Sequence, residues 1–152
     1  MLEAPDIPGK ADVLAWFGYW PSFHDAEVLS ISLDRSYPSR IAVHTWNRTP
    51  ELDARGYYVL DKHAIVTFVL EDFLLDREGI TNTQIDGFNK QNVLSSLTVR
   101  KTLEGYDLIL NGIFGVSASI SVRCLRVELS PGKPKPPNGS SLDTDKRQST
   151  TI

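Results

Sequence analysis

The stretch that decides the fold covers residues 20–33 and reads WPSFHDAEVLSISL, where helical spacing gives way to strand alternation. Apolar positions ahead of it recur at helical spacing and predict a short helix over residues 10–20 that Pro21 ends: Val13, Leu14, Phe17 and Trp20. Beyond it, Leu29, Ile31 and Leu33 alternate with polar residues. They predict a strand over residues 26–35 with these three side chains facing the core.

Strand patterns fill most of the remaining chain. Strands are predicted over residues 40–47, over the apolar residues 57–75, and over a hairpin made of residues 93–103 and 106–113. Within residues 57–75, the side chains expected to be buried on both faces of the sheet are Ile65, Val66, Phe68, Val69 and Leu70. The last predicted strand, residues 116–129, changes phase, and a β-bulge near Arg123 and Cys124 would bring both apolar sets onto the core side. The fold class is therefore α+β, a mainly antiparallel β-sheet with a short N-terminal helix packed on it.

The chain divides into a domain and a tail. The length of 152 residues fits one α+β domain over residues 1–130. Residues 131–152 form a tail rich in Pro, Lys and Ser that has little to bury, and it is expected to be disordered.

Charge and cysteine content restrict the partners. Residues 1–130 carry 17 acidic and 12 basic side chains, whereas residues 131–152 carry two acidic and four basic ones. An acidic domain disfavours nucleic acid and suits a basic protein partner. No apolar run is long enough to span a membrane, and Cys124 is the single cysteine, which is compatible with a reducing compartment.

Two carboxylates interrupt the predicted core face of the first strand. Extending the line of Leu29 backwards by twos gives Glu27 and Asp25. Ionised carboxylates are rarely buried without partners. Either Asp25 caps the turn and Glu27 pairs with an arginine across the sheet, for which the candidates are Arg100, Arg123 and Arg126, or the two carboxylates form a pocket or a patch that faces a partner.

Catalytic and metal chemistry find little support. His24 and Asp25 would point to opposite faces of a regular strand, and His44 and His63 are distant in sequence, so no metal site or cofactor is predicted. Cys124 lies among apolar residues, where a cysteine usually acts as a small hydrophobe. The residues therefore show no recognisable catalytic motif, and no catalytic residues are predicted.

Aromatic residues gather ahead of the two carboxylates. Helical spacing turns Phe17 and Trp20 inwards, whereas Trp16 and Tyr19 fall at the edge of the apolar stripe. These two are either part of the core or part of an interface, since an exposed Trp or Tyr beside carboxylates is typical of a protein-binding hot spot. The residues predicted to contact a partner are Asp25, Glu27, His24, Trp16 and Tyr19.

The nine residues WPSFHDAEV (20–28) and the strand that follows resemble the immunity protein 50 family of bacterial polymorphic-toxin systems, and residues 110–115 (LNGIFG) are similar to the C-terminal half of that family. The resemblance covers about residues 10–129. The resemblance implies a cytoplasmic protein that is not an enzyme and that neutralises a cognate toxin by binding it. Neither nucleic acid nor a membrane is predicted as a partner.

Two rival classes stay open. A small-molecule binding domain or an uncharacterised enzyme would have a pocket at Asp25 and Glu27 with no arginine beside them. A homodimer would instead be joined through exposed strand edges.

Overall fold

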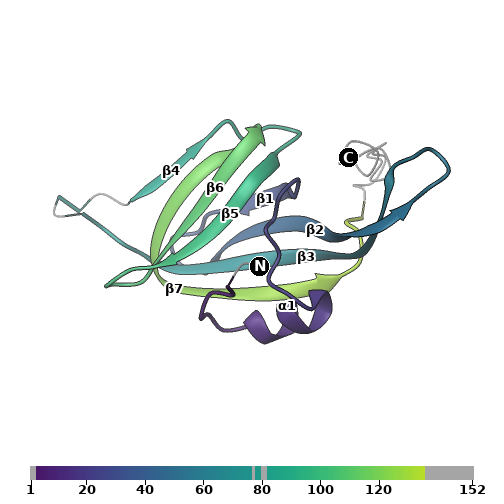
Figure 1. Ribbon diagram of the computed structural model, residues 1–152. Helices are drawn as coiled ribbons and strands as arrows, with labels where there is room; N and C mark the ends of the chain where they lie inside the picture. Colours follow the sequence, from purple (N-terminus) through teal and green to yellow (C-terminus); the bar gives the residue numbers. More distant parts are fainter. Residues whose placement is uncertain (1–2, 77, 80–81, 136–152) are drawn as a thin grey trace.

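A computed structural model describes residues 3–76, 78–79 and 82–135 of the chain (Figure 1). The described residues form one α-helix and seven strands: α1 (Lys10–Phe17), β1 (Glu27–Ser32), β2 (Ser39–Leu52), β3 (Tyr58–Phe73), β4 (Thr83–Asp86), β5 (Val93–Lys101), β6 (Tyr106–Phe114) and β7 (Ser117–Pro131). All strand pairs are antiparallel. The predicted α+β class, mainly an antiparallel sheet with a short helix packed on it, is confirmed.

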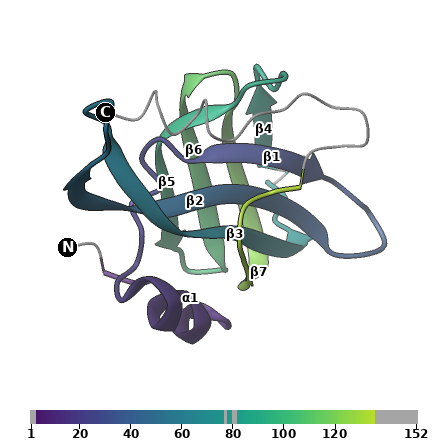
Figure 2. The ribbon, with the colours of Figure 1, turned by 90° about the vertical axis from the view of Figure 1, so that its right-hand side faces the viewer.

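The sheet closes on itself. Its strand order is β3-β2-β1-β5-β6-β7-β4, and β3 also pairs with β7. The long β7 pairs with β6 in its first half and with β3 in its second half, and Val122 is the residue that opposes both Tyr106 and Phe73. As a result β5, β6 and the start of β7 form one layer, which crosses behind the layer of β1, β2 and β3 (Figure 2).

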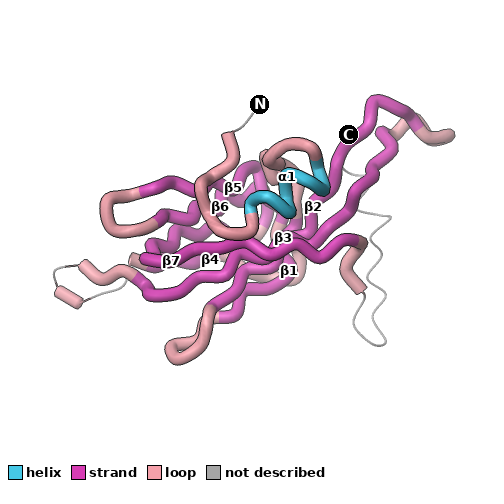
Figure 3. The backbone as a smooth tube through the Cα atoms, turned by 90° about the horizontal axis from the view of Figure 1, so that it is seen from below, coloured by secondary structure: helices cyan, strands magenta, loops and turns pink. Residues whose placement is uncertain are grey.

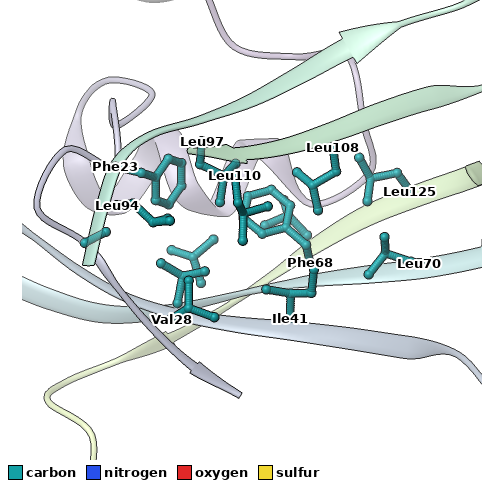
Figure 4. Close-up of a cluster of buried hydrophobic side chains, with 14 of the residues drawn as sticks. Phe23, Val28, Ile41, Phe68, Leu70, Leu94, Leu97, Leu108, Leu110 and Leu125 are labelled. Atoms are coloured by element: carbon teal, nitrogen blue, oxygen red, sulfur yellow. The ribbon is translucent and has the colours of Figure 1, made fainter. Parts of the chain in front are cut away.

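The core fills the space between these two layers (Figure 4). Leu94, Leu108 and Leu110 come from the first layer and meet Ile41 and Phe68 of the second, all at most 1% exposed. Burying an apolar side chain of this size stabilises the fold by about 1.5–3 kcal/mol. The strong apolar runs of the sequence therefore account for the packing.

Helix α1 is shorter than predicted. It ends at Phe17 because Gly18 takes a left-handed conformation (φ 82°) and donates its N–H to the Leu14 carbonyl at 2.8 Å. The helix lies against β7 and β3 (Figure 3). Its buried side chains are those of Val13 and Phe17. Gly9 is required ahead of it, since a Cβ there would lie 1.8 Å from the Val127 carbonyl oxygen.

Strand β1 does not bury the predicted face. Its register with β2 shifts between Val28 and Ser30, so Leu29 is an extra residue and Val28, not Leu29, is the fully buried side chain. Ile31 packs partly against the core, but Leu33 is 53% exposed, so the prediction that Leu33 faces the core is wrong.

The phase change in β7 is confirmed, but its predicted cause is wrong. Both apolar sets are buried, as the burial of Val122 and Leu125 shows. However, β7 pairs with β3 without a register shift, so no bulge is present at Arg123 and Cys124. The strand instead passes from one layer to the other at this point, and Cys124 is exposed rather than packed as a hydrophobe.

The predicted tail begins too early. Pro131 is the last residue of β7, Gly132 donates its N–H to the His63 carbonyl at 2.7 Å, and Pro134 is buried. Residues 131–135 therefore belong to the folded domain. The rest of the predicted disordered tail, residues 136–152, lies outside the described residues.

Candidate protein-binding surface

The segment between α1 and β1 is built from an unusual backbone. Phe23 and Asp25 both have positive φ, 61° and 65°, a conformation that costs roughly 1–3 kcal/mol for a residue with a side chain. The Phe23 ring compensates for this because it is 1% exposed and packs edge-on against Phe68. The Asp25 N–H donates to the Leu94 carbonyl at 2.8 Å and ties the segment to β5.

This backbone brings His24 and Asp25 together. His24 Nε2 lies 3.6 Å from Asp25 Oδ1, and Arg48 Nη2 lies 3.5 Å from Asp25 Oδ2. The expectation that His24 and Asp25 point to opposite faces is wrong because it assumed a regular strand. Asp25 thus forms an ion pair with Arg48 of β2 and is not open to a ligand.

Glu27 lies on the outer face of the sheet and is nevertheless only 5% exposed. It opposes His44 across the β1–β2 ladder. The predicted arginine partners all bind elsewhere: Arg100 pairs with Asp107, Arg123 with Asp72 and Arg126 with Glu71.

A histidine pair continues this cluster. His44 Nε2 and His63 Nδ1 lie 3.0 Å apart, so one nitrogen donates its proton to the other, and the two rings stack with centroids 5.2 Å apart. The Trp46 ring lies beside both histidines. Glu27, His44, His63 and Trp46 therefore form one packed polar and aromatic group on the outer face of β1, β2 and β3.

Next to this group is a pocket of about 320 Å³. It opens between the segment that follows α1 and the middle of β2, and its lining residues are Tyr19, Pro21, Ser22, Phe23, His24, Thr45, Trp46, Asn47 and Arg48.

Two of the predicted contact residues, Tyr19 and His24, thus line the same pocket, whereas neither Asp25 nor Glu27 lines it.

Tyr19 is held firmly in the pocket wall. Its hydroxyl donates to Asn47 Oδ1 at 2.5 Å, and Asn47 Nδ2 donates to Asp61 at 2.8 Å. Burial, and secondly the negative charge of Asp61, raise the pKa of the Tyr19 hydroxyl above its ordinary value. The ring is therefore a fixed, neutral part of the surface.

Trp16 has a structural role in this arrangement. Its indole N–H donates to the Lys62 carbonyl at 2.9 Å, and its half-buried ring packs against the core. It fastens α1 to β3 and does not line the pocket.

Beyond the pocket, β2 and β3 continue as a projecting hairpin (Figure 1), called the arm here and covering residues 47–61. Its turn is held by Asp53, which accepts the N–H groups of Tyr57 and Arg55 at 3.1 and 2.8 Å. These bonds, first that of Tyr57, lower the pKa of the Asp53 carboxyl. The Arg48 guanidinium lies 5.4 Å from the centre of the Tyr58 ring, and Leu52, opposite Tyr58, is 60% exposed.

The pocket and the arm are one continuous surface, joined by Arg48, and it is called the aromatic surface here: Tyr19, His24, Trp46, Arg48, Leu52 and Tyr58. Sequence reasoning missed its β2 and β3 members. The available signal was the stretch Trp46-Asn47-Arg48, where the alternation of β2 ends, and the register of β2 with β3 does shift there.

Comparisons with known proteins find no matching family model, no matching curated protein and no matching solved structure. Within the part of the chain that the structure describes, no helix has the length and apolar character needed to cross a membrane. The same residues contain no group of three or more side chains placed to hold a metal ion.

Proposed function

We propose that this protein binds another protein through the aromatic surface and that its partner is a cognate bacterial toxin, which it neutralises by occlusion in the cytoplasm. The observation that carries the proposal is the composition and rigidity of that surface. Trp, Tyr and Arg are the residues that dominate binding energy in protein interfaces. Here Trp46, Tyr58 and Arg48 lie together at a pocket and a projecting arm.

Rigidity adds to this argument. The Asp53 turn, the Tyr19–Asn47–Asp61 hydrogen bonds and the Arg48–Asp25 ion pair hold the surface in one shape before a partner arrives. Less conformational entropy is then lost on binding, so more of the contact energy appears as affinity. The excess of acidic side chains in residues 1–130 favours a basic partner, and the resemblance to toxin immunity proteins indicates the same class.

The rival prediction of a small-molecule pocket at Asp25 and Glu27 is less favoured. It required carboxylates without an arginine partner, whereas Asp25 is paired with Arg48 and Glu27 is 5% exposed. The neighbouring pocket, at Tyr19 and His24, is lined by aromatic and polar side chains and continues into the arm, an arrangement that suits a protein surface.

The experiment pairs this protein with the product of its neighbouring gene. Purified proteins are tested by biolayer interferometry, and growth is followed when the neighbouring gene is expressed with and without this one. We expect tight binding and restored growth. Absence of both would end the toxin hypothesis.

Two pairs of variants locate the surface. Tyr58→Ala should weaken binding by roughly 30-fold, because truncating a hot-spot residue costs about 2 kcal/mol or more. Tyr37→Ala removes a ring that is 76% exposed on the β1–β2 loop and should leave binding unchanged. Leu52→Ala and Leu103→Ala make the same comparison at two hairpin tips, and equal losses within either pair would place the interface elsewhere.

A further inference from the structure

The closed sheet has one short seam. In the part of the chain that the structure describes, β1 pairs with β5 at a single position, Glu27 opposite Val93. Three flanking backbone bonds complete this seam. The Asp25 N–H donates to the Leu94 carbonyl at 2.8 Å, the Leu94 N–H to the Ala26 carbonyl at 2.8 Å, and the Val28 N–H to the Asn92 carbonyl at 2.9 Å. After Val28 the two strands part, and β1 continues to Ser32 as an edge strand.

The polar groups of this edge have a defined direction. Along a strand of an antiparallel pair, the backbone N–H and C=O groups of successive residues point alternately towards the partner strand and away from it. Val28 bonds to Asn92, on the side away from β2. Since Leu29 is the extra residue and Ile31 opposes Ile41, the alternation turns the N–H and C=O of Ile31 to the open side.

Among the residues that the structure describes, no strand pairs with this edge beyond Val28, and its own sequence offers little protection. Natural edge strands are blocked by charges, by proline or by a covering element. Residues 28–33 read VLSISL and contain neither charge nor proline. Leu33, at the end of this run, is 53% exposed.

The same run is a palindrome. Leu29-Ser30-Ile31-Ser32-Leu33 reads identically in both directions. In an antiparallel pair of two copies centred on Ile31, Ile31 opposes itself, Ser30 opposes Ser32 and Leu29 opposes Leu33. A two-fold symmetric interface requires this self-complementarity.

We propose that the protein forms a homodimer in which the β1 edges of two copies pair antiparallel about Ile31. Ser30 and Ser32 then make a ladder on the outer face, where serine pairs hydrogen-bond across strands. Leu33 of each copy becomes covered on the core side. The proposal does not rest on toxin binding, because no residue of the aromatic surface lies between 29 and 33.

The first test measures mass by sedimentation equilibrium over a range of concentrations. We expect a species of twice the 17.0 kDa monomer, with a dissociation constant on the order of micromolar because the interface is small. Leu33→Lys should shift the equilibrium to monomer, since it places a charge against Leu29 of the other copy. Leu103→Lys, at the exposed tip of the β5–β6 hairpin, should not. A mass of 17.0 kDa at every concentration, or equal effects of the two variants, would overturn the proposal.

The second test fixes the register by disulfide trapping. The background is Cys124→Ser, since Cys124 is exposed. Ser30 and Ser32 of opposite copies would have Cα atoms about 4.5 Å apart, within disulfide reach, whereas two copies of Ser30 would lie about 7–8 Å apart.

Oxidising a mixture of Ser30→Cys and Ser32→Cys proteins should therefore give the mixed dimer, and each variant alone should give little. Preferential self-crosslinking of either variant, or no crosslinking in the mixture, would refute pairing about Ile31.

Discussion

The two outer faces of the closed sheet differ in chemistry. The face of β1, β2 and β3 carries the Glu27, His44, His63 and Trp46 group, with long side chains packed on one another. The face of β5, β6 and β7 carries polar side chains that bond locally: Asn111 Nδ2 donates to Ser96 Oγ at 3.0 Å, and Arg100 pairs with Asp107 at 2.6 Å. The first face instead holds large aromatic rings in contact with one another. This difference is the reason to seek function on the first face.

The largest expected effect comes from the histidine pair. His44→Ala removes a side chain that is 1% exposed and breaks its bond to His63, so the free energy of unfolding should fall by about 2–3 kcal/mol. Ser96→Ala, on the opposite face, should cost about 0.5 kcal/mol or less. Urea unfolding followed by circular dichroism measures both. Equal losses would remove the distinction between the faces.

An acid-dependent effect is expected on the opposite face. The Ser121 hydroxyl, and secondly the Arg100 guanidinium, hold the pKa of Asp107 below its ordinary value. A lowered folded-state pKa adds stability above the unfolded-state value of 3.8, and this stability is lost as the pH falls through the folded-state value.

Asp107→Asn should therefore cost about 1.5 kcal/mol at pH 7, a typical value for hydrogen bonds to a charged group, and much less in strong acid. Urea unfolding at several pH values checks this. Asp86→Asn, on an exposed strand, is the control. A cost that is constant with pH would show that the charge of Asp107 is not involved.

Tyr19 offers a smaller effect on the first face. Tyr19→Phe removes the hydrogen bond to Asn47 and should lower the free energy of unfolding by about 1 kcal/mol. Since the pKa of Tyr19 is raised, the ultraviolet titration of the native protein should also lose one late-ionising tyrosine. If the loss falls instead among the tyrosines that ionise first, Tyr19 is not enclosed as described.

The smallest effect should be the same in the arm and in the β5–β6 hairpin. Arg55 lies 5.2 Å from the centre of the Tyr57 ring, and the Lys101 ammonium lies 4.4 Å from that of Tyr106. At exposed sites a cation–π contact contributes about 0.5–1 kcal/mol. Arg55→Ala and Lys101→Ala should thus have similar small costs in thermal unfolding, and a much larger cost for Arg55 would mean that the arm depends on it.

The sequence predicts the parts of this fold that follow a regular period. The β5–β6 hairpin and the buried run of β3 are such parts, and both are confirmed. The failures occur where the period breaks. The extra residue at Leu29 moves Leu33 out of the core, and the positive φ of Asp25 turns its carboxylate to His24 and Arg48. A register shift or a left-handed residue depends on tertiary partners, and these are distant in sequence.

The candidate site was predictable only in its N-terminal half. Tyr19 and His24 stand out because aromatic residues and a broken strand pattern gather there. Trp46 and Arg48 reach the same pocket only through the pairing of β1 with β2, which the sequence does not specify. Their neighbour His63 joins through the pairing of β2 with β3.

The contact between Pro8 and Val127 has a consequence for biosynthesis. The Val127 N–H donates to the Pro8 carbonyl at 2.9 Å, so the segment ahead of α1 is seated against β7, which is synthesised much later. The β3–β7 pairing that closes the sheet also forms only after β7 has been synthesised. Synthesis proceeds at about 5–20 residues per second, so α1 and the open edge of β3 stay unpartnered for several seconds in each nascent chain. During that interval neither α1 nor the edge of β3 has the contacts with β7 that the finished fold gives it.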